Sequence, residues 1–97
     1  MYYDINKLTK VLEKHAVYLL TGDASKRADL SGANLSGANL SGADLSGADL
    51  SGADLTDAWL QNTIIKDTIL TNAILSGAWL NGARLPKYYF LPVNDNG

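Results

Sequence analysis

The sequence predicts an all-β solenoid, a narrow coil in which the backbone turns a corner once in every five residues. A five-residue period begins at Ala28 and runs through twelve units to Lys87. A large aliphatic residue stands at the centre of every unit. An α-helix would spread these side chains around its axis, and a straight strand would place successive ones on opposite faces. Only a path that turns once per unit points all of them inward.

The residue types at the corners support this path. Two positions after the aliphatic residue, eleven units carry Gly, Asn or Asp: Gly32, Gly37, Gly42, Gly47, Gly52, Asp57, Asn62, Asp67, Asn72, Gly77 and Gly82. These residues accept the positive φ angle that a type II turn needs at its third position. Two positions before the aliphatic residue, ten units carry Ala, and Thr63 and Thr68 replace it in the others. We expect these small side chains to fill the corners of a packed interior.

The segment before the repeat, residues 1–27, predicts an amphipathic helix over residues 4–21. Asp4 is suited to cap its start and Gly22 to end it. We interpret the helix as a cap over the first coil, because the end of a stacked repeat needs a cover. The alternative is a helix that docks in a partner or on a membrane through its lysines. After the repeat, residues 88–97 form a tail with three aromatic residues that we expect to cover the last coil.

The repeat resembles the pentapeptide-repeat family, whose motif centres on Leu or Phe preceded by Ala and by Asp or Asn. Residues 28–87 match this motif, and residues 28–55 are nearly the family consensus. The resemblance implies a right-handed quadrilateral β-helix with four units per coil. Twenty residues would then close one turn, and the repeat would form about three coils. Short members of this family are abundant in cyanobacteria, and most have no assigned biochemical role.

Composition and charge argue against several kinds of protein. The chain has no Cys, which excludes a disulfide framework and a thiolate metal site. Its first ten residues lack the apolar core of a signal peptide, and no run of apolar residues is long enough to span a membrane. A net charge of −2 is too balanced to favour nucleic acid. We therefore expect a cytoplasmic protein that binds neither nucleic acid nor membrane.

The sequence offers no catalytic, metal-binding or cofactor-binding residues. His15 and Glu13 are the only residues of their types, and neither has a second ligand or base at a usable spacing. We interpret His15 as a partly buried structural residue. Four Asp residues of the repeat, Asp29, Asp44, Asp49 and Asp54, each precede an aliphatic residue and face solvent on a convex surface without a cleft. We expect no enzyme and no cofactor.

One feature is not required by the fold. The outward residue before each aliphatic residue is polar in the first six units and then becomes apolar in five successive units: Trp59, Ile64, Ile69, Ile74 and Trp79. These five residues, here called the apolar belt, would wrap one full turn of the coil. Three interpretations fit them: the C-terminal tail covers the belt, the belt forms a homodimer, or it binds another protein.

These observations predict a non-catalytic solenoid that serves as a protein-protein interaction or scaffold module through the apolar belt, with a partner of unknown identity. The alternative is a mimic of DNA that inhibits a type II topoisomerase, as larger family members do. A rod of three coils rises only about 14 Å, because coils stack at the spacing of β-strands. Duplex DNA carries one charge per about 1.7 Å, so mimicry would need a longer and more acidic rod.

Overall fold

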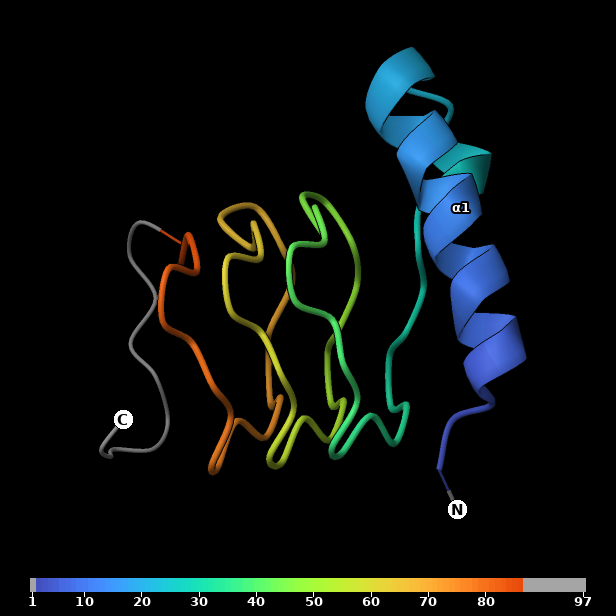
Figure 1. The fold of residues 1–97 in the computed structure, drawn as a ribbon. Coiled ribbons are helices and arrows are strands. Elements are labelled where there is room, and N and C mark those ends of the chain that lie inside the picture. Colours follow the sequence, from blue (N-terminus) through green and yellow to red (C-terminus); the bar gives the residue numbers. More distant parts are fainter. Residues whose placement is uncertain (1, 87–97) are drawn as a thin grey trace.

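The computed structural model describes residues 2–86. The predicted aromatic tail of residues 88–97, together with Lys87, lies outside the described residues. Helix α1 (Ile5–Thr21) and the short 3₁₀ helix η1 (Ala24–Lys26) precede the repeat. From residue 28 the chain winds into coils that follow one another in sequence order away from α1, which lies across the first coil (Figure 1).

The ends of helix α1 are fixed by the two predicted capping residues. The Asp4 carboxylate accepts a hydrogen bond of 2.8 Å from the backbone N–H of Asn6. At the other end Gly22 has a φ of 78°, and its N–H donates to the Tyr18 carbonyl. The predicted helix is confirmed, with its first residue at Ile5 rather than Asp4.

The inner face of α1 covers the first coil. Leu8 is 3% exposed, and Val11 and Leu12 pack against the core of the repeat. The backbone N–H of Tyr3 also donates to the carbonyl of Asn34 at 2.9 Å, which satisfies a polar group at the edge of the coil. Through these contacts α1 covers the apolar end of the first coil.

The coils pair through residues that are twenty apart in the sequence. Eight parallel bridges join the residues that precede the aliphatic positions: Asp29–Asp49, Asn34–Asp54, Asn39–Trp59, Asp44–Ile64, Asp49–Ile69, Asp54–Ile74, Trp59–Trp79 and Ile64–Arg84. This register confirms four units per coil. It also stacks Leu30, Leu50 and Leu70 in one interior column.

The coil differs from the all-β prediction in one respect. Among residues 2–86 the bridges are isolated, and none extends into a strand of a sheet. The reason is the short unit. The turn that begins at each aliphatic residue closes with a hydrogen bond to the residue three positions later, as from the Ala33 N–H to the Leu30 carbonyl at 3.1 Å. Only the residue before the aliphatic position remains to form a bridge with the next coil.

The corners follow the predicted turn chemistry with one exception. The corner glycines from Gly32 to Gly52 have φ angles between 69° and 79°, and Asp57, Asn62 and Asn72 also have positive φ. Asp67 does not. At this corner the Gly47 N–H donates to the carbonyl of Asp67 itself, whereas the Gly42 N–H donates to Gln61, one residue before the matching corner residue. The prediction of a positive φ at Asp67 is therefore wrong.

The interior is a column of aliphatic side chains. Ten of the twelve predicted inward residues are buried, from Leu30 to Leu75. Leu80 is half-buried and Leu85 is 36% exposed, so the inward residues of the last described units are less buried than those before them. At two corners a buried Thr replaces Ala, and its hydroxyl donates to a carbonyl: Thr63 to Leu60 and Thr68 to Leu45, both at 2.6 Å. Thr therefore fills the corner without leaving an unsatisfied hydroxyl.

Candidate functional site

The apolar belt is mostly accessible to solvent. Trp59 and Ile74 are each 46% exposed, Ile69 is 41% exposed and Trp79 is 55% exposed. Ile64 is half-buried and contributes less surface. Four of the five belt residues are therefore available for contact.

The bridges between coils place the belt residues on defined faces. Trp59 and Trp79 lie on one face with ring centroids 6.1 Å apart and ring planes 24° from parallel. Ile69 pairs with Asp49 on a second face, and Ile74 pairs with Asp54 on a third. Each of these isoleucines therefore lies one coil away from a carboxylate.

The six polar outward residues form a hydrogen-bond motif that the sequence analysis missed. In each unit the side-chain Oδ1 accepts from the backbone N–H and from the hydroxyl of the residue two positions later. These residues are Asp29, Asn34, Asn39, Asp44, Asp49 and Asp54. The signal was visible as Asp or Asn followed two positions later by Ser or Thr, the signature of an Asx turn.

These hydrogen bonds also lower the pKa of repeat carboxylates. The Ser31 hydroxyl and N–H lower the pKa of Asp29, and Ser51 lowers the pKa of Asp49 in the same way. Thr56 lowers the pKa of Asp54. The three carboxylates are thus ionised partners of turn hydroxyls, and they form the solvated faces that the sequence analysis expected.

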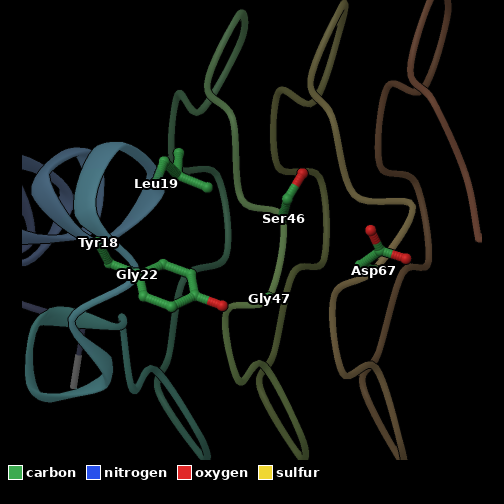
Figure 2. Close-up of a pocket in the computed structure, with 6 residues that line it drawn as sticks. All are labelled: Tyr18, Leu19, Gly22, Ser46, Gly47 and Asp67. Atoms are coloured by element: carbon green, nitrogen blue, oxygen red, sulfur yellow. The ribbon is translucent and has the colours of Figure 1, made fainter.

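A shallow pocket lies between the C-terminal end of α1 and the irregular corner of the coil (Figure 2). It has a volume of about 330 Å³ and is lined by Tyr18, Leu19, Gly22, Ser46, Gly47 and Asp67. The Tyr18 phenol points toward Gly47, where an added Cβ would lie 2.7 Å from the phenol oxygen. One carboxylate, one phenol and one hydroxyl around a shallow pocket do not form a nucleophile with a base.

His15 lies deeper than the sequence analysis expected. The ring is 1% exposed, and its Nδ1 accepts a hydrogen bond of 3.0 Å from the backbone N–H of Ala28. Burial lowers the pKa of His15. Within residues 2–86 no three His, Asp or Glu side chains gather as metal ligands, and no helix is long and apolar enough to cross a membrane.

Comparison with known proteins identifies the repeat. The family model described as pentapeptide repeats matches residues 28–67 and 48–85, with eight copies. The chain belongs to the pentapeptide-repeat family. Pentapeptide-repeat proteins are generally non-catalytic repeat proteins. No functionally curated protein matches this pentapeptide-repeat chain.

Three solved structures from cyanobacteria are similar to this pentapeptide-repeat protein. Rfr23 from Cyanothece 51142 is 41% identical over 61% of this chain and 37% of its own, with a TM-score of 0.38. HetL from Nostoc sp. strain PCC 7120, involved in heterocyst differentiation regulation, is 43% identical over 63% of this chain and 31% of its own, with a TM-score of 0.39. The protein alr5209 from Nostoc PCC 7120 is 25% identical over 76% of this chain and 87% of its own, with a TM-score of 0.29. The matched part of this chain thus spans about a third of the first two proteins.

Proposed function

We propose that this pentapeptide-repeat protein is a non-catalytic, cytoplasmic binding module, with a right-handed four-sided coil, that holds another protein on its apolar belt. The observation that carries the proposal is the switch of the outward positions from polar to apolar residues. The belt residues that remain exposed lie in the second and third coils, and the polar residues dominate the coil next to α1.

The belt is costly to the fold, which argues that it serves a contact. Each polar outward residue accepts two hydrogen bonds from its own turn, as Asp49 does from Ser51. Trp and Ile have no acceptor for these bonds, and a typical net contribution of a hydrogen bond is about 1 kcal/mol. The belt units lose this stabilisation while they expose large apolar side chains to water. A partner that covers the belt would recover the free energy of apolar burial.

The charge around the belt favours a basic partner. Residues 28–86 contain six Asp against one Lys and one Arg, a balance of −4. Asp49 and Asp54 lie directly beside Ile69 and Ile74 across the bridges. We therefore propose a partner protein whose contact surface is apolar at its centre and carries Lys or Arg at its rim, because complementary charges favour and orient such a contact.

The stacked tryptophans are the proposed anchor of the contact. Exposed Trp side chains often dominate the binding free energy of an interface. Trp59 and Trp79 present two adjacent indoles on one face, and the pair is already ordered by its mutual packing. The partner therefore binds a largely preformed aromatic surface, which lowers the entropic cost of association.

The test compares two substitutions by measured affinity. A tagged protein is used to isolate partners from the source cell, and each partner is then purified and titrated by calorimetry. We expect the double substitution Ile69→Asp and Trp79→Asp to weaken binding by at least about tenfold, because it removes apolar area at the centre of the contact. We also expect the affinity of the unchanged protein to fall as NaCl is raised.

The matched control is Asn39→Asp, which changes an exposed residue on the tryptophan face but in the first coil. It keeps the turn acceptor and adds a carboxylate without removing apolar area, so it should not weaken the binding. Equal binding by the double variant would contradict the proposal. Sedimentation data showing that the belt mediates only self-association would also contradict it, because the belt would then be a homodimer interface and not a site for a basic partner.

A further inference from the structure

Helix α1 is joined to the first repeat unit by an imidazole that takes the place of a missing turn carbonyl. In the units that follow, the backbone N–H of the first residue donates a hydrogen bond to the carbonyl of the aliphatic residue three positions earlier. Ala33 donates to Leu30 in this way, and Ala48 donates to Leu45. Ala28 begins the first unit, and no aliphatic residue of the repeat precedes it. Its N–H donates to Nδ1 of His15 instead, at 3.0 Å.

This hydrogen bond requires a neutral imidazole. Nδ1 can accept only when it carries no proton, so the ring proton must be on Nε2. Nε2 is buried and makes no well-formed hydrogen bond within the described residues. A second proton would turn Nδ1 into a donor that opposes the Ala28 N–H. Protonation would also place a positive charge in a site where the residue is only 1% exposed, and burying a charge without a partner costs free energy.

The groups that face the ring come from each element around it. Tyr18 on α1 stacks at a tilt, with ring centroids 5.2 Å apart. The Asp44 carboxylate on the coil favours a charged ring, as does the nearby Ser46 backbone, and the Arg27 guanidinium disfavours it. Burial is the largest of these influences and lowers the pKa of His15 below its ordinary value of about 6.5.

We propose that His15 is a pH-sensitive latch, which holds α1 on the first coil when it is neutral and releases the helix when it is protonated. Release would uncover the aliphatic column at Leu30 and Leu35, together with the Ala28 N–H. The protein would then present an apolar end in acid that is covered at neutral pH. This device uses the end of the coil opposite to the belt and does not depend on the proposed partner.

The direction of the pH effect follows from proton linkage. The docked ring binds a proton less readily than the free ring, so the released state takes up more protons. Docking is therefore strongest above about pH 6.5 and weakens as the pH falls. It should weaken by about tenfold per pH unit until the docked ring itself is protonated.

The test is an NMR titration of the full chain from pH 8 to pH 4.5. The chain has one His, so the imidazole signal is unique. Hydrogen exchange of the α1 amides, corrected for the intrinsic effect of pH, reports release of the helix. We expect the imidazole to titrate below pH 6.5, the Ala28 amide signal to move over the same range, and the α1 amides to lose protection while the middle coil keeps it.

Substitutions near the ring test the charges that surround it. Asp44→Asn keeps the turn acceptor, as Asn34 and Asn39 show, and should move helix release to higher pH, because the docked imidazolium loses a carboxylate that favours it. Arg27→Gln removes a positive charge that opposes the docked imidazolium and should move release to lower pH. The control is Asp54→Asn, the same change on a different face, which should leave the midpoint in place.

Non-titrating variants of His15 complete the experiment. His15→Asn keeps an acceptor near the position of Nδ1 and should keep α1 protected over the whole pH range. If release of α1 still depends on pH in this variant, the proposal is overturned. It is also overturned if the imidazole of the unchanged protein becomes protonated while the α1 amides stay protected from exchange. If His15→Asn does not fold, the test rests on the Asp44 and Arg27 variants, whose pH midpoints of helix release should shift in opposite directions. Equal midpoints in the two variants would overturn the proposal.

Discussion

Whether a side chain in the coil is buried or exposed depends on its position in the five-residue unit. Position three is apolar and points inward, and the period alone is enough to predict this, because no regular helix or strand places every fifth residue on one side. Leu50 is fully buried in the middle coil, and its neighbours in the column are Leu30 and Leu70. A narrow coil has few side chains that can move into a void at this point.

We therefore expect Leu50→Ala to lower the free energy of unfolding by about 2–5 kcal/mol. The matched control is Leu85→Ala, since Leu85 is the inward residue of the last described unit and is 36% exposed. Its loss should be clearly smaller. Urea denaturation followed by circular dichroism measures both values, and equal losses would mean that the column is not the centre of the core.

Two residues show why sequence reasoning stops short at this scale. His15 was expected to be partly buried, but its hydrogen-bond partner lies thirteen residues away and is fixed only when the helix docks on the coil. Asp67 was expected to have a positive φ, but its residue type only permits that conformation. In both cases a preference of the residue is known from sequence, and its use is decided by tertiary contacts.

At the scale of the element, the repeat unit is a turn stabilised by its own polar residue. Helix α1 and its caps were predictable, because Asp4 and Gly22 act through backbone groups close in sequence. The single-residue bridges were not, because the family resemblance implies a β-helix without stating how much of each unit remains extended. The length of the turn leaves one bridging residue per unit.

The Asx turns predict a loss of stability in acid. The pKa of Asp29, Asp49 and Asp54 is lowered in the folded chain by the turn hydroxyls and N–H groups. A lowered folded pKa contributes stability above the unfolded value of about 3.9, and this contribution is lost as the pH falls through the folded pKa. We expect the free energy of unfolding to decrease below about pH 4.

The matched variant replaces all three residues by Asn, which Asn34 and Asn39 show to be compatible with the same turn. Its free energy of unfolding should vary less between pH 4.5 and pH 2.5 than that of the unchanged protein. Urea titrations at fixed pH values provide the comparison. Parallel curves for the two proteins would show that these carboxylates do not sense folding.

At the scale of the whole molecule, the coils form a one-dimensional stack in which each coil is stabilised by its neighbours. The coil of residues 48–67 is hydrogen-bonded on both sides, through Asp49 to the first coil and through Leu50 to Ile69 of the third. The first coil has the second coil on one side and α1 on the other. The belt lies away from α1, so the two ends of the molecule have different chemistry.

This arrangement predicts an uneven resistance to local unfolding at neutral pH. We expect the amides that join the middle coil to its neighbours, such as those of Leu50 and Leu55, to exchange with solvent most slowly. Amides of α1 should exchange faster, because the helix can leave the stack while the pairing between coils remains. Residue-resolved hydrogen exchange tests this order. Equal rates in α1 and in the middle coil would show that the cap and the coil unfold together, and the stability of the stack would then depend on the helix as much as on its aliphatic column.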